Sequence, residues 1–262
     1  MLGAIIGDIV GSKYEFNNIR TKNFELFSYG CDFTDDSVMT VAIAKAILDC
    51  EKDYHLLSQK AIENMRRFGV MYPHRGYGER FAKWLYSDKP QPYNSCGNGS
   101  AMRVSACGFA GKSLADVIAL SHAVTEVTHN HPEGIKGAEA TAVAIFLAKS
   151  GENITYIRRY ICENYYNIDF TLNDIRRTYH FGETCQTSVP QAMEAFFESC
   201  DFEDAIRNAI SIGGDSDTIA AIAGGIAEAY YGIPESIQSK ARRYLDMEMQ
   251  IILNEFETCF QF

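Results

Sequence analysis

Apolar residues recur every three or four positions along most of the chain, which predicts helices rather than strands. No segment alternates apolar and polar residues as a half-buried strand does, although Tyr and Phe are abundant. We therefore predict an all-α fold of many short helices. In chain order they are expected near 1–12, 36–50, 55–69, 78–86, 100–110, 114–126, 132–149, 153–165, 188–199, 202–211, 216–231 and 235–257.

Nothing in the sequence divides the chain. It contains no linker, low-complexity stretch or repeat, so residues 1–262 are predicted to form a single domain. The longest segment without a clear period, residues 17–33, lies between short acidic motifs. Loops in that position are candidate active-site lids, and we expect the segment 13–33 to influence substrate choice.

Two of the predicted helices are rich in small residues. Gly3, Gly7 and Gly11 stand at every fourth position of the first helix, a spacing that gives a groove for close helix approach. The helix 216–231 consists almost wholly of Ala, Gly and apolar residues, so we expect it to be central, and Gly232 fits its C-terminal stop.

An acidic motif precedes each of two apolar helices. Because buried carboxylates are costly without a compensating cation, the two motifs together predict a divalent-metal site of hard oxygen ligands, suited to Mg²⁺, Mn²⁺ or Ca²⁺. This many carboxylates could hold two ions. The candidate ligands are Thr34, Asp35, Asp36, Asp215, Asp217 and Thr218.

Two simpler interpretations apply to these motifs. Each motif alone reads as a helix N-cap, since Asp, Ser and Thr satisfy the first amides of a helix. An EF-hand is the other alternative for the second motif, and it fails. Counting from Asp215, the sixth position is Ala220 instead of Gly and the twelfth is Ile226 instead of Glu.

Composition narrows the classes of partner. The net charge is −10 and the pI is near 5.1, which argues against capture of nucleic acid or an anionic membrane surface. Eight scattered cysteines without a Cys-x-x-Cys pair are typical of reduced thiols in a cytoplasmic protein. The apolar N-terminus lacks the basic region of a signal peptide, and no apolar run reaches membrane-spanning length.

Two further motifs are candidates for ligand binding. Gly97-Asn98-Gly99 before a predicted helix offers close backbone amides and a positive helix end, as pyrophosphate binding requires; the alternative is an ordinary turn. His129 and His131 have a spacing known from zinc sites, but no third soft ligand stands nearby. His131 and Glu133 are expected to be structural.

Taken in order, these motifs resemble those of the ADP-ribosylglycohydrolase family, the group that includes the dinitrogenase-reductase-activating glycohydrolases. The resemblance spans residues 3 to 232. It rests on Gly3-Ala-Ile-Ile-Gly7-Asp8-x-x-Gly11-x-x-x-Glu15, Thr34-Asp35-Asp36, Gly97-Asn98-Gly99-Ser-Ala-Met-Arg103, Thr128-His129, Ser188-Val-Pro-Gln-Ala and Gly213-Gly-Asp-Ser-Asp-Thr218.

The resemblance implies a compact orthogonal helix bundle with a binuclear Mg²⁺ centre that hydrolyses the bond between ADP-ribose and an acceptor. It implies the six metal ligands already named, with Asp36 and Asp217 catalytic. Glu15 is assigned to metal or water positioning, and Asp8 to a supporting role or to anchoring the first helix. The implied contacts with ADP-ribose are Ser95, Gly97, Asn98, Gly99 and His129.

The sequence leaves the roles of Tyr93, Arg103 and His129 open. Several relatives have an aromatic residue where this chain has Cys96, so adenine stacking there is in doubt and Tyr93 is a substitute. Arg103 fits either the phosphates or a surface salt bridge. His129 fits either the phosphate or adenosine side of the cleft, or a buried, hydrogen-bonded histidine.

The sequence thus predicts a cytoplasmic Mg²⁺-dependent hydrolase that releases ADP-ribose from a modified side chain, such as Arg or Ser, or from a small conjugate. Mn²⁺ could replace Mg²⁺, and the oligomeric state stays open. One alternative is a catalytically inactive ADP-ribose-binding or structural member of the fold, since some members serve as lens proteins. The other is a hydrolase of a different nucleotide-like substrate.

Overall fold

The all-α prediction is confirmed by the structure, a computed structural model that describes residues 1–260. Within these residues it contains helices and no β-strand. The α-helices are α1 Leu2–Ser12, α2 Asp35–Leu48, α3 Leu57–Met71, α4 Glu79–Leu85, α5 Ser105–Ala110, α6 Leu114–Thr125, α7 Pro132–Lys149, α8 Ile154–Asn164, α9 Leu172–Ile175, α10 Cys185–Phe197, α11 Phe202–Ser211, α12 Ser216–Tyr231, α13 Glu235–Ala241 and α14 Met247–Phe260. Three 3₁₀ turns are η1 Tyr54–Leu56, η2 Asn98–Ser100 and η3 Arg242–Tyr244.

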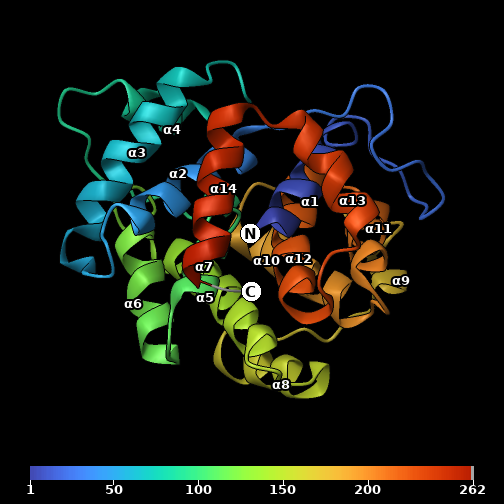
Figure 1. Cartoon of the computed structure of the whole chain (residues 1–262). Helices are drawn as coiled ribbons and strands as arrows, with labels where there is room; N and C mark the ends of the chain where they lie inside the picture. The colour runs from blue at the N-terminus through green and yellow to red at the C-terminus, as the bar shows by residue number, and fades with distance from the viewer. Residues whose placement is uncertain (261–262) are drawn as a thin grey trace.

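Helix α12 occupies the centre and is buried from Ser216 to Glu228. Helix α1 lies directly against it, and Figure 1 shows the two side by side. A Cβ atom at Gly7 would overlap with the backbone of Ala220, and one at Gly3 with the carbonyl of Gly224. The glycine spacing therefore does what the sequence predicted, because it lets two backbones approach without intervening side chains.

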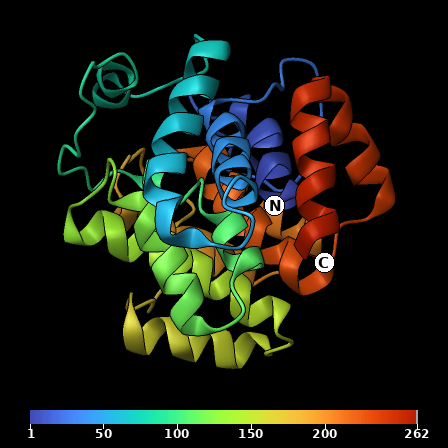
Figure 2. The same ribbon diagram turned by 60° about the vertical axis from the view of Figure 1, so that its left-hand side comes forward.

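The remaining helices surround this pair. Helices α7, α10 and α11 pack on α12, whereas α2 packs on α1 and carries α3 and α14 on its other sides. Figure 2 shows α14 beside the N-terminal helix, so the two ends of the described chain are close together. This arrangement brings the N-terminal ends of α2 and α12 to one place.

Local capping signals explain many of the helix starts. Ser113, Asn153 and Asp201 precede α6, α8 and α11, and each side-chain oxygen accepts a backbone N–H of the first turn. The chain leaves α12 through Gly232, whose φ of 72° favours glycine. These starts and the stop at Gly232 agree with the predicted bounds.

Two predicted helices are shorter than expected. The segment near 100–110 begins with the single turn η2 and becomes α-helical only at Ser105, because side-chain hydrogen bonds from Asn98 and Ser100 to distant segments hold it. The segment 235–257 is divided into α13 and α14. Asp246 ends the connection and caps α14 by accepting a hydrogen bond from the backbone N–H of Met249 at 3.0 Å.

Helix α9 was not predicted. It is one turn long and begins with a capping box, in which Thr171 and Asp174 exchange hydrogen bonds. The Thr-x-x-Asp spacing in the sequence was the available signal for this turn.

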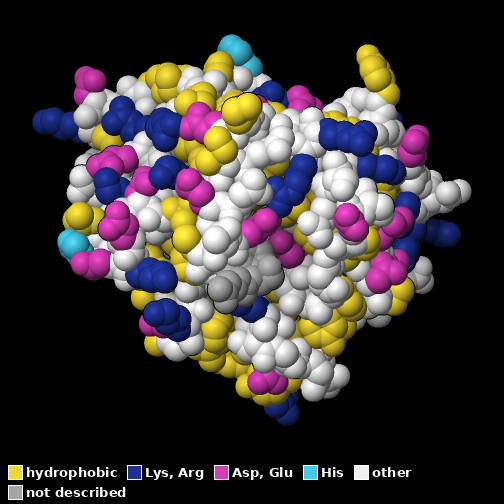
Figure 3. Space-filling view, viewed as in Figure 1, with side chains coloured by type: hydrophobic (Ala, Val, Ile, Leu, Met, Phe, Trp, Pro, Cys, Tyr) yellow, Lys and Arg dark blue, Asp and Glu magenta, His cyan; other side chains and the backbone are white. Residues whose placement is uncertain are grey.

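Both signs of charge are interspersed over the face of the molecule shown in Figure 3. All eight cysteines are free thiols, as the sequence predicted. None of the helices within residues 1–260 is long and apolar enough to cross a bilayer.

Candidate active site

A pocket of about 350 Å³ opens where the first turns of α2 and α12 meet. One side of it is acidic and includes Glu15, from the loop after α1. The other side comes from the start of α4, the segment around η2, and His129. The acidic lining residues are Glu15, Asp35, Asp36, Glu79, Glu183, Asp215 and Asp217.

The first acidic motif begins helix α2. Thr34 is the N-cap residue, and its hydroxyl oxygen accepts a hydrogen bond from the backbone N–H of Asp36 at 3.3 Å. The same hydroxyl donates to Asp8 Oδ1 at 2.7 Å. The simple capping interpretation is therefore correct for Thr34. Because Thr34 makes the cap, the carboxylates of Asp35 and Asp36 are not needed for it, and both line the pocket.

The second motif begins helix α12 and does not behave as a cap. Asp215 holds the N-cap position without a side-chain capping hydrogen bond. Gly213 and Gly214, with φ of 67° and 78°, make the preceding turn. Both residues favour positive φ, so the turn aims Asp215 and Asp217 into the pocket.

The two motifs, far apart in sequence, meet as predicted. The Thr218 hydroxyl donates to Asp36 Oδ2 at 3.2 Å. Carboxylate oxygens of Asp8, Asp36 and Asp217 lie within 4.8 Å of one another, and so do those of Glu15, Asp215 and Asp217. Asp217 belongs to both groups, so the carboxylates form one continuous acidic centre.

The electrostatics of this centre favour a bound cation. Burial, followed by the negative charges of Asp217 and Asp8, raises the pKa of Asp36 well above its ordinary value. Burial and Asp217 raise the pKa of Glu15 to about 8. Asp36 Oδ1 is buried and has no hydrogen-bond partner among the described residues. An orphaned carboxylate oxygen among repelling carboxylates fits a hard divalent cation.

Asp8 has a supporting place at the base of the centre. It is fully buried, and Oδ2 accepts hydrogen bonds from the backbone N–H groups of Thr34 and Ser37, both at 2.9 Å. The hydroxyls of Thr34 and Ser37 also donate to it. Asp8 thereby anchors α1 to the first turn of α2, and it does not line the pocket.

Sequence reasoning missed the role of the Asn98 side chain. Its Nδ2 donates to Asp215 Oδ2 at 2.6 Å and to Ser188 Oγ at 2.9 Å. The amide thus orients a candidate metal ligand, while Asn98 also lines the pocket as predicted. The available signal was that Gly97-Asn98-Gly99 and Ser188-Val-Pro both belong to the ordered motifs of the family resemblance.

Asn18 was also missed. Its side-chain oxygen accepts from the Gly214 backbone N–H at 2.7 Å, and its Nδ2 donates to the Gly214 carbonyl at 2.9 Å. The same Nδ2 donates to the carbonyl of Glu15 at 2.9 Å. Asn18 therefore fastens the loop that carries Glu15 to the turn that carries Asp215. No recognisable motif marks such a residue in the sequence.

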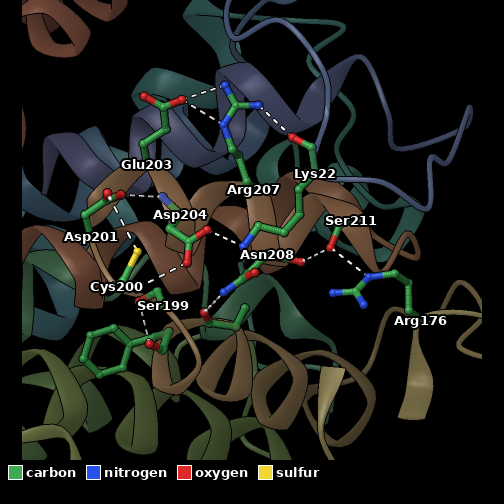
Figure 4. A network of polar contacts seen from close by, with 12 residues as sticks. Lys22, Arg176, Ser199, Cys200, Asp201, Glu203, Asp204, Arg207, Asn208 and Ser211 are labelled. Atoms are coloured by element: carbon green, nitrogen blue, oxygen red, sulfur yellow. Dashed lines mark hydrogen bonds and ion pairs between the residues drawn. The ribbon is translucent and has the colours of Figure 1, made fainter. Parts of the chain in front are cut away.

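The expectation of a lid over residues 17–33 needs correction in part, because several contacts fix its middle to the body. Arg207 of α11 donates to the carbonyls of Lys22 and Phe24, at 2.9 and 2.7 Å, and Lys22 pairs with Asp204. Figure 4 shows this network on the outer side of α11. Residues 20–24 are thus held against α11 rather than over the pocket.

The other predicted contacts also lie at the pocket, next to the acidic centre, which Asn98 touches through Asp215. Ser95, Gly97, Asn98, Gly99 and His129 all line the pocket. The predicted positive helix end is wrong, because η2 is a single turn. The backbone N–H groups of Gly97 and Asn98 already donate to Ser95 Oγ and to the Glu183 carbonyl, respectively. Two of the amides expected to face pyrophosphate are therefore occupied.

The histidines have separate roles. His129 is buried, lines the pocket, and its Nδ1 hydrogen-bonds the Thr128 hydroxyl at 2.7 Å. Both sequence interpretations of His129, buried residue and cleft residue, therefore apply. His131 instead caps α7 by accepting from the Glu133 backbone N–H at 3.1 Å, so the zinc pairing has no support and the structural interpretation is confirmed.

Arg103 does not form the surface salt bridge that was one of its two predicted roles. It is 1% exposed, and its Nη2 donates to the Val124 carbonyl at 3.1 Å and to the Thr128 hydroxyl at 2.7 Å. The residue still borders the pocket. Its two hydrogen bonds hold the segment that presents His129.

Comparisons with known proteins agree with this geometry. The ADP-ribosylglycohydrolase family matches residues 1–257. The chain is 26% identical to ADP-ribosylhydrolase ARH3 of Homo sapiens, over 100% of this chain and 92% of that protein. It is 25% identical to ADP-ribosyl-dinitrogen reductase glycohydrolase of Rhodospirillum rubrum, over 95% and 90%.

The fold is also found among solved structures. A structure described as an ADP-ribosylglycohydrolase-related protein complex matches with a TM-score of 0.72 at 21% identity, over 98% of this chain and 96% of that chain. At this identity the match supports the helical fold, while the family match spans the chain and includes both acidic motifs. The chain belongs to the ADP-ribosylglycohydrolase family.

Proposed function

We propose that the pocket is the active site of a metal-dependent ADP-ribosyl hydrolase, which cleaves the glycosidic bond between ADP-ribose and a modified side chain or small conjugate. The observation that carries the proposal is the pair of carboxylate groups that share Asp217. The names of the relatives, ADP-ribosylhydrolase and ADP-ribosyl-dinitrogen reductase glycohydrolase, support the substrate.

The residues that would hold two Mg²⁺ ions, or Mn²⁺ ions, are Thr34, Asp35, Asp36, Asp215, Asp217 and Thr218. When bound, such ions supply charge that can hold the vicinal hydroxyls of a ribose and activate water. The Thr34 hydroxyl can take part because it donates to Asp8 and still has an unshared lone pair. Asp8 and Asn98 keep these donors in place.

We assign to Glu15 the role of general base. It lies at the pocket beside Asp215 and Asp217, and Asn18 fixes the backbone that carries it. Its carboxylate would accept a proton from the attacking water. Asp36 and Asp217 both line the pocket, and their carboxylates would stabilise the positive charge that develops at the glycosidic carbon.

A catalytically inactive binding or structural protein is the less favoured alternative. A chain without metal chemistry would have no use for an orphaned, buried Asp36 Oδ1, whose neighbours raise its pKa. A hydrolase of another nucleotide-like substrate would share the metals and differ around residues 90–100 and 129–133. We expect the enzyme to work in the cytoplasm.

The test is turnover in Asp36→Ala and Asp217→Ala, with free ADP-ribose binding measured alongside. Both variants should lose turnover while their helical circular dichroism stays largely unchanged. Full activity of either variant with metal present would refute the binuclear assignment. Failure of the unmodified chain to bind free ADP-ribose would favour the other nucleotide-like substrate.

A further inference from the structure

The pocket is lined by a cluster of carboxylates and by two arginines, Arg80 and Arg103. At the acidic centre, carboxylate oxygens of Glu15, Asp215 and Asp217 lie within 4.8 Å of one another. The charges that act on His129 are those of Arg103 and Arg80, and with burial they hold its pKa well below the usual value. The two arginines therefore lie near His129, at what we call the basic end of the pocket, where Glu79 is the neighbour of Arg80 in sequence.

Only one of the two arginines is placed to reach a ligand. Arg103 is fully buried and donates to the Val124 carbonyl and the Thr128 hydroxyl. Arg80, the second residue of α4, is exposed and lines the pocket. No lysine is among the described residues that line the pocket, so Arg80 is the accessible cation there.

Arg80 is held in place by Tyr93. Its guanidinium carbon lies 4.8 Å from the centroid of the Tyr93 ring, and its Nη2 donates to the Tyr93 carbonyl. The Tyr93 ring in turn lies 5.8 Å from the ring of His129. A guanidinium has five N–H donors, so the stack fixes its plane and leaves further donors for a ligand.

This stack changes the expected role of Tyr93. The guanidinium covers one face of the ring, and His129 is tilted at 56° to it. Tyr93 is therefore placed to support Arg80, and stacking of adenine on that ring face would require Arg80 to leave. The stack belongs to the basic end of the pocket rather than to an adenine platform.

We propose that Arg80 binds the diphosphate of the substrate through its guanidinium, with Tyr93 as its positioning residue. This inference rests on the proposed function. A ligand whose ribose diol is held at the acidic centre must place its two negative phosphates away from the carboxylates. Because the backbone amides of Gly97 and Asn98 already donate within the protein, a side-chain cation supplies charge that these two amides do not.

The experiment measures binding of three probes by calorimetry: ADP-ribose, ADP and adenosine. ADP carries the diphosphate without the distal ribose, and adenosine lacks both. The proteins are the unmodified chain, Arg80→Ala, Arg80→Lys and Lys83→Ala. Lys83 is a matched control because it is one turn along the same helix, pairs with Glu79, and does not line the pocket.

Arg80→Ala should weaken ADP and ADP-ribose binding by about tenfold or more and leave adenosine binding unchanged. Arg80→Lys should recover part of the loss, since it restores charge without the planar fork. Lys83→Ala should bind all three probes as the unmodified chain does. Comparison of ADP with adenosine distinguishes a direct contact between Arg80 and the phosphates from a general structural role of Arg80 in the pocket wall.

Equal weakening of adenosine, unchanged ADP binding in Arg80→Ala, or no ADP binding by the unmodified chain would each overturn the proposal. If the unmodified chain binds ADP in an Arg80-dependent manner but not ADP-ribose, the proposed function fails while the diphosphate site stands. If it binds ADP-ribose without any dependence on Arg80, the diphosphate site fails while the proposed function stands.

Discussion

The side-chain amide of Asn98 lies 2.6 Å from Asp215 Oδ2 and donates to it from within the segment that was expected to bind pyrophosphate. The contact joins η2 to the N-terminal end of α12 across 117 residues of sequence. Groups that orient metal ligands are needed nearly as much as the ligands, because a carboxylate with free rotation binds an ion less tightly.

We therefore expect Asn98→Ala to lower activity and divalent-metal affinity by roughly 10- to 100-fold. Asn98→Asp should be worse, because it places another carboxylate against Asp215. Metal titration by calorimetry measures the effect, with circular dichroism as the check on folding. Ser188→Ala removes only the other partner of Asn98 and should have a smaller effect. Unaltered metal affinity in Asn98→Ala would contradict this role.

Close packing of α1 on α12 predicts a large stability effect at Gly7. A Cβ there would overlap with the Ala220 backbone, which cannot rotate away as a side chain would. Gly7→Ala should lower the free energy of unfolding by about 3 kcal/mol, at the upper end of the usual cost of overpacking, as measured by urea denaturation.

Gly225→Ala is the matched control for this substitution. Gly225 lies within α12, and a Cβ there would make only ordinary contacts, the nearest 3.4 Å from Ile145 Cδ1. The control should be neutral, or more stable by up to about 1 kcal/mol, because Ala is the better helix former. Equal stability losses in the two variants would show that the α1–α12 interface is not close-packed as described.

The sequence predicted close helix approach at the first helix, a central helix 216–231 and the meeting of the acidic motifs, because all three depend on local signals. Gly3, Gly7 and Gly11 recur with helical spacing, and Asp, Ser and Thr cluster at two helix starts. In a fold of short helices these local patterns stay informative. The type of a residue and its position in the helix together decide whether its side chain faces another helix or caps the helix start. Thr218 and Asp36 are found within hydrogen-bonding distance for that reason.

The contacts that were not predicted depend on tertiary neighbours. Asn18 and Asn98 are ordinary polar residues in loops, and their roles come from segments about 200 and 117 residues away. Arg103 resembles a surface cation in the sequence, and only the structure shows that it is buried against Thr128. The break at Asp246 between α13 and α14 did have a local signal, an Asp at a capping position, which helical periodicity concealed.

The closely spaced carboxylates of the acidic centre should lower the stability of the metal-free protein even though turnover requires them. Without metal, burial and repulsion among Asp36, Asp217 and Asp215 destabilise the folded chain. Asp217→Asn should therefore raise the melting temperature in EDTA, by on the order of 2–4 °C for each kcal/mol relieved, while it abolishes turnover. Differential scanning fluorimetry measures the shift.

Asp88→Asn, in an exposed loop, is the control and should leave the melting temperature within about 1 °C, because exposed substitutions rarely change stability by more than about 0.5 kcal/mol. Added Mg²⁺ should stabilise the unmodified chain more than it stabilises Asp217→Asn. A lower melting temperature for Asp217→Asn in EDTA would mean that the carboxylates do not oppose folding.

Glu194 gives the chain a pH-dependent contribution to stability. Its carboxyl is buried on α10 beside Arg158, 2.9 Å away, and burial raises its pKa to about 7 from 4.5. The folded state therefore holds a proton that the unfolded chain releases between these values. The stabilising effect of the protonated form is complete below about pH 4.5 and is lost as the pH rises through 7.

Glu194→Gln removes this dependence, so its stability relative to the unmodified chain should increase from pH 4.5 to pH 7 and then level off. Urea denaturation at several pH values measures the difference between the two proteins. Glu163→Gln, at an exposed position of α8, should follow the unmodified chain at every pH. A Glu194→Gln difference that stays constant with pH would contradict the assignment.

We propose that the acidic centre performs metal-dependent release of ADP-ribose. The direct measurement is ADP-ribose released from matched arginine-linked and serine-linked ADP-ribosyl peptides, in Mg²⁺ and in EDTA. We predict release from at least one of them in Mg²⁺, and none in EDTA. Release that continues undiminished in EDTA, or no release from either peptide in Mg²⁺, would contradict the account.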